Sequence, residues 1–277
     1  PAGSTGNIPG QVYTPGNVFQ NQTGDVASDH YHRYEEDAGL MRELGLQAYR
    51  LSISWPRVVP AGDGVINQRG LDFYDRLVDA LLARGVEPWV TLFHWDVPRW
   101  CALRGSWLNR EIHQQFAAYT QAVVDRLGDR VSKWMTINEP QIFLGPTEHE
   151  GLQTSNKRAS HYERLLAAHH CLMSHGHSVQ VIRARAKKSP MVGWAPIGRA
   201  KAPYAEMLPG HGLGHPAGDG RMLAEPTAEN LEAAKRATLG IHQRDFWNNA
   251  WFADPVVFGH YPEDGLRLYG SEMPKIE

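Results

Sequence analysis

The sequence is poor in cysteine, in charge of one sign and in long apolar runs. Its 277 residues include only Cys101 and Cys171, which excludes a disulfide framework and is compatible with a reducing compartment. Lys and Arg total 28 against 30 Asp and Glu, so neither nucleic acid nor an anionic membrane is an expected partner. No stretch approaches the roughly 18 apolar residues of a membrane span. We therefore expect a cytoplasmic protein that acts on a small molecule.

Helical and extended patterns alternate along the chain. Apolar residues at helical spacing, mostly ended by glycine, predict helices at 34–44, 70–84, 116–127, 161–186 and 231–240, and the segment from there through 251 is also expected to be helical. Runs rich in aromatic and branched residues predict strands at 48–55, 86–94, 131–138 and 191–197. Such alternation favours parallel strands joined by crossover helices. We expect the α/β class and one domain over 1–277, because single barrels of about 250 residues are common.

Polar and aromatic side chains gather where the predicted strands end. The ends carry Ser54-Trp55, His94-Trp95-Asp96 and Asn138-Glu139-Pro140. In a barrel of parallel strands, the carboxyl ends of the strands form the face that carries the chemistry. Such a set suits a sugar, because sugar rings stack on indole and sugar hydroxyls need polar partners. Glu139 is placed to protonate a leaving glycosidic oxygen.

Five longer segments follow one another in a recognisable order. They are TGDVASDHYHRYEED at 23–37, YRLSISWPRVVP at 49–60, TLFHWDVPRW at 91–100, GDRVSKWMTINEP at 128–140 and WNNAWFADPVVFGHYPEDG at 247–265. With these segments the chain resembles glycoside hydrolase family 1, the β-glucosidase group of (β/α)8 TIM barrels. The resemblance implies a retaining β-glycosidase that hydrolyses terminal β-linked sugars from small glycosides or oligosaccharides.

The resemblance also implies a role for each of five residues. Glu139 matches the general acid/base, and Asn138 matches the residue that contacts the sugar 2-hydroxyl. His94 matches a residue that binds a hydroxyl of the same ring, and Trp95 would help to wall that subsite. Arg50 matches an arginine that lies beneath the nucleophile and keeps it ionised, as a cation beside a carboxylate does.

The residues alone leave structural alternatives open. Arg50 could serve only as an ion-pair partner in the barrel, His94 as a satisfied core histidine, and Glu139 as a buried structural carboxylate. Packing, rather than ligand contact, is expected for Trp55, Trp89 and Trp134.

Fourteen histidines invite a metal hypothesis, particularly His169-His170 and His175-Gly176-His177. No His-Glu-x-x-His spacing occurs, and the resembled family uses no metal for catalysis. We therefore expect no metal and no cofactor. The glycine-rich stretch at 210–215 is too loose to cradle phosphate and has no predicted task.

One required group is missing. Retaining hydrolysis needs two carboxylates about 5–5.5 Å apart. The resemblance places the nucleophile in a Thr-Glu-Asn-Gly element, which this sequence lacks, and Glu229-Asn230 inside a predicted helix is no substitute. A first strand ending in Gln is also absent before Gly6. We expect about strands 2 to 5 of the barrel, incomplete at both ends.

Several questions stay open at this level. Segments 101–107 and 146–156 differ from the family pattern on the aglycone side, so the sugar and aglycone preferences are undecided. The oligomeric state is undecided as well. The missing nucleophile motivates one alternative function, a non-catalytic carbohydrate- or partner-binding barrel remnant, and a second alternative, a gene remnant without a folded product.

Overall fold

The computed structural model describes residues 26–62, 64–144, 159–198, 200, 204–206, 221–223, 227–241 and 249–275. The chain divides into two compact units, 1–196 and 197–277, and each is described by itself. Residues 1–25, in which no first strand was expected, and the segments 146–156 and 210–215 lie outside the described residues, so the expectations about them stay untested.

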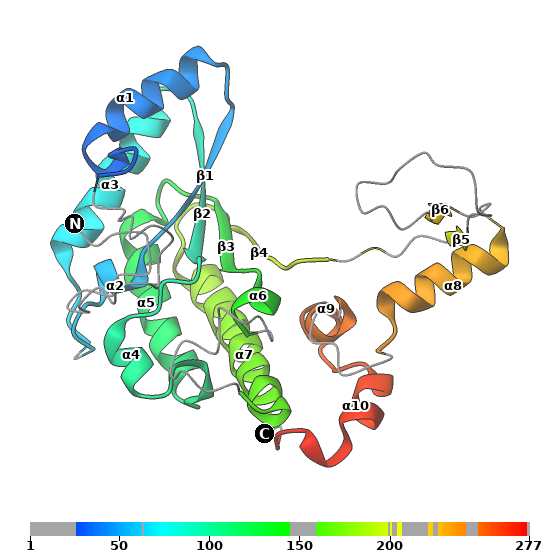
Figure 1. The fold of residues 1–277 in the computed structure, drawn as a ribbon. Helices are drawn as coiled ribbons and strands as arrows, with labels where there is room; N and C mark the ends of the chain where they lie inside the picture. Colours follow the sequence, from blue (N-terminus) through cyan, green and yellow to red (C-terminus); the bar gives the residue numbers. More distant parts are fainter. Residues whose placement is uncertain are drawn as a thin grey trace. The chain divides into compact units, whose positions relative to one another are not determined.

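Four parallel strands form the sheet of the first unit. They are β1 (Ala48–Ser52), β2 (Glu87–Phe93), β3 (Lys133–Asn138) and β4 (Met191–Ala195), and they lie side by side in chain order (Figure 1). Each strand lies within a stretch that the sequence predicted to be extended. Consecutive parallel strands with helical crossovers are the arrangement of a barrel segment.

Long helices connect these strands. They are α3 (Gln68–Ala83), α5 (Ile112–Leu127) and α7 (His161–Arg185), whereas α1 (His30–Glu43) precedes β1. α3 forms because its apolar residues recur at helical spacing, and that stripe is buried. α7 begins at a capping box, in which the Ser160 hydroxyl accepts from the Glu163 N–H and the Glu163 carboxylate accepts from the Ser160 N–H.

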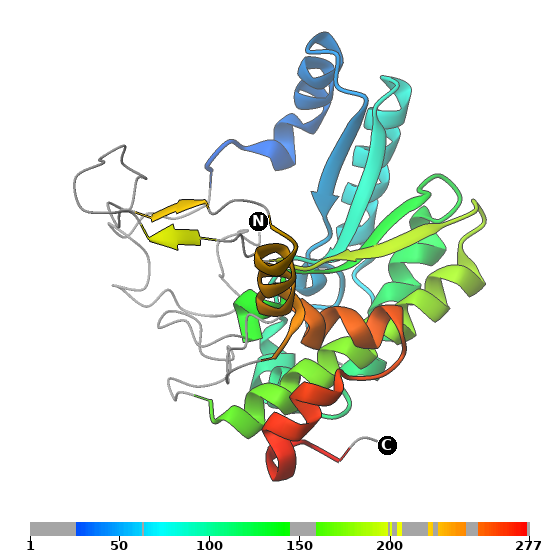
Figure 2. The same ribbon diagram turned by 90° about the vertical axis from the view of Figure 1, so that its right-hand side faces the viewer.

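The helices cover one face of the sheet. α3 contacts β2, α7 contacts β3 and β4, and α5 packs between α3 and α7 (Figure 2). Residues on this covered face are almost fully buried: Leu51 is 7 %, Val90 0 % and Trp134 2 % exposed. The opposite, open face carries Arg50, Trp89 and Met191 in one lateral row. The two faces therefore differ in exposure along this row, because successive side chains of a strand point to opposite faces.

The prediction of a strand at 48–55 was too long. β1 ends at Ser52, and Trp55 is the first residue of a short helix, α2 (Trp55–Val58). Pro56 explains the change, because proline has no N–H for a strand ladder and suits the first helical turn. The packing role expected for Trp55 is confirmed, since it is 1 % exposed and stacks on Tyr119 with ring centroids 5.4 Å apart.

Further short helices follow the carboxyl ends of β2 and β3. They are α4 (Arg99–Leu103), the 3-10 turn η2 (Ser106–Leu108) and α6 (Pro140–Leu144). Trp107 of η2 and Phe143 of α6 pack on Phe93 of β2 with ring centroids about 5 Å apart. This aromatic group ties the turns that follow β2 and β3 to the core beneath the strand ends.

The second unit contains a two-stranded antiparallel ribbon and three α-helices in its described part. The elements are β5 (Tyr204–Glu206), β6 (Arg221–Leu223), α8 (Ala228–Leu239), α9 (Asn249–Val257), α10 (Glu263–Tyr269) and the 3-10 turn η3 (Gly270–Glu272). Trp251 is buried against Tyr261 and Tyr269. In neither unit does any described helix combine the length and apolar character needed to cross a bilayer.

Candidate active site

The five predicted site residues meet at the carboxyl ends of β1, β2 and β3. Arg50 lies on β1, His94 and Trp95 follow β2, and Asn138 and Glu139 end β3. Arg50 Nη2 donates to Asn138 Oδ1 over 2.5 Å, and Trp95 Nε1 donates to the Asn138 carbonyl over 3.0 Å. The charges of Arg50 and Glu139 both act on His94. The spatial gathering expected from the sequence is therefore present.

Arg50 fixes the orientation of the Asn138 side-chain amide. Its Nε also donates to Thr91 Oγ1 over 3.1 Å, so the guanidinium is held between β2 and β3. A guanidinium can only donate, so the oxygen of the Asn138 amide must face it. The amide nitrogen of Asn138 is then the group left for a ligand that accepts a hydrogen bond. Asn138 is 2 % exposed, so its amide is buried, whereas the Arg50 side chain that orients it is exposed.

His94 is the polar group on the exposed side of the site. Partial loss of hydration lowers the pKa of its imidazole, and the nearby Arg50 cation lowers it further, while the Glu139 carboxylate opposes both. A neutral imidazole at neutral pH offers one donor and one acceptor, which suits a hydroxyl group.

Glu139 lies in a strained backbone conformation. Its φ is 46°, in the left-handed region that residues other than glycine rarely adopt. Its N–H donates to the Ala195 carbonyl of β4 over 2.7 Å, and Pro140 then begins α6. Strand, left-handed residue and helix follow one another here, so the chain turns sharply at the carboxylate. Such outliers cluster at functional sites.

Trp95 is the second strained residue of the site. Its φ is 81°, a value that is a clear outlier for a bulky side chain. The indole lies beside the imidazole of His94, with ring centroids 5.5 Å apart. Its N–H is engaged by the backbone of Asn138, a contact that the sequence did not indicate.

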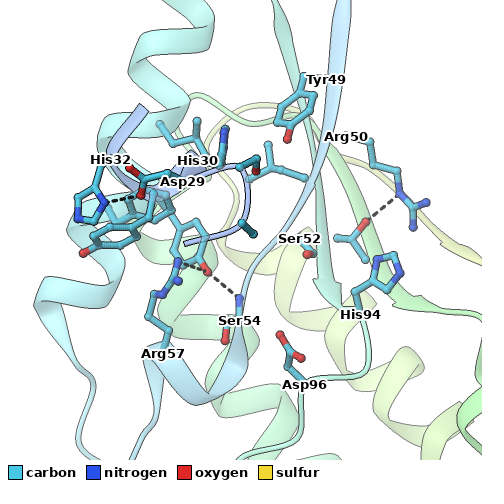
Figure 3. A pocket seen from close by; sticks show the side chains of 18 of the residues that line it. Asp29, His30, His32, Tyr49, Arg50, Ser52, Ser54, Arg57, His94 and Asp96 are labelled. Carbon is cyan, nitrogen blue, oxygen red and sulfur yellow. Dashed lines mark hydrogen bonds and ion pairs between the residues drawn. The ribbon is translucent and has the colours of Figure 1, made fainter. Parts of the chain in front are cut away.

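A cavity of about 430 Å³ opens beside β1, lined by Arg50, His94 and Asp96 among other residues (Figure 3). Asp96 lines this cavity, and the sequence analysis did not select it, although it directly follows His94-Trp95. Burial raises the pKa of its carboxyl to about 6, and the Arg57 cation opposes this. Its signal in the sequence was only its place at a strand end.

The gathered groups can perform one half of a two-carboxylate reaction. Glu139 supplies a carboxyl, Asn138 an amide donor, His94 a hydroxyl partner, and Arg50 a fixed cation at the edge of the site. Within the described residues, no three His, Cys, Asp or Glu side chains come together as a metal site would require.

Residues 10–211 match the model of Glycosyl hydrolase family 1. The chain belongs to this family. Among curated family 1 proteins, β-glucosidase A of Thermotoga maritima is 38 % identical over 263 residues, which are 95 % of this chain and 53 % of the relative. The β-glucosidase of an Agrobacterium species is 39 % identical over 264 residues, 95 % of this chain and 51 % of the relative.

Solved family 1 structures agree. The virulence factor SghA of Agrobacterium tumefaciens matches with a TM-score of 0.76 and 37 % identity, over 95 % of this chain and 52 % of that one. The Thermotoga maritima β-glucosidase in complex with noeuromycin matches with a TM-score of 0.74 and 36 % identity, over 95 % and 53 %. The chain thus spans about half the length of the family 1 relatives that it matches, and its parallel sheet is part of a (β/α)8 TIM barrel.

Proposed function

We propose that this chain is part of a retaining β-glycosidase of the β-glucosidase type. Glu139 acts as general acid toward the glycosidic oxygen and later as general base toward water, while a nucleophilic carboxylate comes from outside this chain. The observation that carries the proposal is the placement of Glu139 beside Asn138, Arg50 and His94 at the carboxyl ends of three parallel strands.

The other residues have supporting tasks in this proposal. Asn138 donates to the sugar 2-hydroxyl, His94 binds a second hydroxyl of the same ring, and Arg50 holds the nucleophile ionised beside the Asn138 amide. A small-molecule β-glycoside is the proposed substrate. The Thermotoga maritima β-glucosidase complex with noeuromycin, and the SghA complex with its substrate analog salicin, support a small glycoside-like ligand. Relatives named as β-glucosidases favour this proposal over a non-catalytic remnant.

The test is Glu139→Gln in the complete gene product that contains this chain. We expect kcat/KM for an unactivated β-glucoside to fall by about 10² to 10⁴-fold, because general acid catalysis contributes that much. The matched control is Glu229→Gln, the same chemical change at an exposed position in the first turn of α8. Undiminished turnover by Glu139→Gln, with the control unchanged, contradicts the proposal.

A further inference from the structure

The peptide group between Asn138 and Glu139 is held from both sides. Its carbonyl accepts from the indole N–H of Trp95 over 3.0 Å, and its N–H donates to the Ala195 carbonyl over 2.7 Å. The C=O and N–H of a trans peptide point in opposite directions, so one bond reaches toward β2 and the other toward β4. The plane of this peptide is therefore fixed between the two neighbouring strands.

On the β2 side, the indole of Trp95 donates the hydrogen bond that a backbone N–H of the neighbouring strand would ordinarily donate. β2 ends at Phe93, before the chain reaches the level of Asn138. Trp95 turns into the left-handed region, and its indole supplies the N–H that the ended strand no longer offers. A buried carbonyl without a donor would be costly, and Asn138 is almost fully buried.

The fixed peptide determines where the Glu139 carboxyl points. Glu139 precedes Pro140, and a residue before proline is disfavoured in the right-handed helical region and favoured in an extended one. The observed φ of 46° is neither, so it persists only while the surrounding bonds hold it. Without the Trp95 bond, only the bond to Ala195 holds the peptide, so it can rotate toward the extended form, and that rotation carries the carboxyl away from its present direction.

We propose that Trp95 is a positioning residue whose indole N–H, through the Asn138 carbonyl, aims Glu139 at the glycosidic oxygen. The inference rests on the proposed role of Glu139 as general acid and adds to it. Trp95 then acts through its N–H, independently of any contact between its ring and the sugar.

The experiment compares two substrates with the same sugar in the complete gene product. Phenyl β-glucoside has a poor leaving group that needs a proton to depart. The dinitrophenolate group of dinitrophenyl β-glucoside departs without being protonated. For Trp95→Phe we expect kcat/KM to fall by about 10²-fold with the phenyl substrate, the loss that a misplacement of about 1 Å can cause. With the dinitrophenyl substrate, kcat/KM stays within about threefold, because no proton transfer is needed.

The matched control is Trp100→Phe. The indole of Trp100 also donates to a backbone carbonyl, that of Val59 over 2.8 Å, away from Glu139. We expect this control to leave the ratio of the two kcat/KM values unchanged. Should Trp95→Phe fail to fold, benzothienylalanine at position 95 keeps the ring size and removes only the N–H.

The outcomes separate this inference from the proposed function. A selective loss with the phenyl substrate supports the positioning role. An equal loss with both substrates means that Trp95 serves packing or sugar binding, and no loss means that its N–H is dispensable; either result overturns the inference. If Glu139→Gln itself shows no selective loss with the phenyl substrate, the proposed function fails instead.

Discussion

The two faces of the four-stranded sheet use the same strands for different purposes. The covered face consists of apolar side chains closed off by α3, α5 and α7, and Trp134 there is 2 % exposed. The open face holds Arg50 and Thr91, and Trp89 there is 38 % exposed. The neighbours Trp89 and Val90 therefore experience a solvated surface and a dry core, respectively, whereas Thr91, farther along β2, is fully buried. Substitutions on the covered face should change stability, whereas those on the open face should change chemistry.

The largest effect is expected from substitutions of Trp134 and Trp89. These two residues lie on adjacent strands and face opposite sides of the sheet, so they compare the two faces directly. We expect Trp134→Ala to lower the free energy of unfolding of the 277-residue chain by about 3–5 kcal/mol, the cost of removing a large aromatic from a core. Trp89→Ala should cost about 1 kcal/mol or less, as exposed positions do. Urea unfolding measures both values, and equal losses would mean that the two faces do not differ.

A histidine on the covered side gives the next largest effect. His175 of α7 accepts or donates a hydrogen bond with Thr136 Oγ1 over 2.7 Å and is buried. Burial lowers the pKa of its imidazole to about 4, and the Arg183 cation adds to this. In the unfolded chain the same group has a pKa of about 6.5. Between pH 6.5 and 4 the unfolded state therefore binds more protons, and the free energy of unfolding falls as the pH falls.

This linkage predicts a specific comparison with His175→Gln. The stability advantage of the natural chain over the variant at pH 7 should shrink by about 3 kcal/mol at pH 4. The matched control on the open face is His94→Gln, for which we expect a smaller change. Urea unfolding across this pH range measures the difference, and a pH-independent advantage would exclude His175 as the group responsible.

Substitution of Arg50, on the open face of the sheet, is expected to give the smallest of the three effects. Arg50→Met removes the charged donors to Thr91 and Asn138, and a hydrogen bond to a charged group contributes about 1.5–3 kcal/mol. We expect kcat/KM of the complete gene product to fall by about 10 to 100-fold. Arg76→Met, at an exposed position of α3, is the control.

Much of the fold could be predicted from the sequence because its periodicities are strong. All four strands of the parallel sheet and the long helices of the first unit fall where the apolar patterns placed them, within a few residues at their ends. The errors arose where local chemistry overrides the pattern. At 53–58 an apolar run continues past β1, but Pro56 converts it into the helix α2. The two short strands of the second unit left no periodic signal, because each has only three residues.

The candidate site was predictable as a set of residues but not as a geometry. Strand ends and the family resemblance selected Arg50, His94, Trp95, Asn138 and Glu139. Neither could reveal the left-handed backbones or the bond from Trp95, because these depend on how adjacent strands end relative to one another. Asp96 was missed because its raised pKa comes from burial in the cavity beside β1, a three-dimensional property. The roles of the site residues, the cytoplasmic location and the single-domain organisation stay predictions.

The left-handed conformations at positions 95 and 139 have a consequence for attempts to engineer this protein. Glycine relieves the steric conflict at such φ values, so a design method that optimises backbone energy alone would favour it at both positions. Each substitution would improve local backbone energetics while deleting the indole or the carboxyl group. A library aimed at greater thermal tolerance should therefore keep Trp95 and Glu139 unvaried, because the proposed chemistry needs the side chains of these two residues with strained backbones.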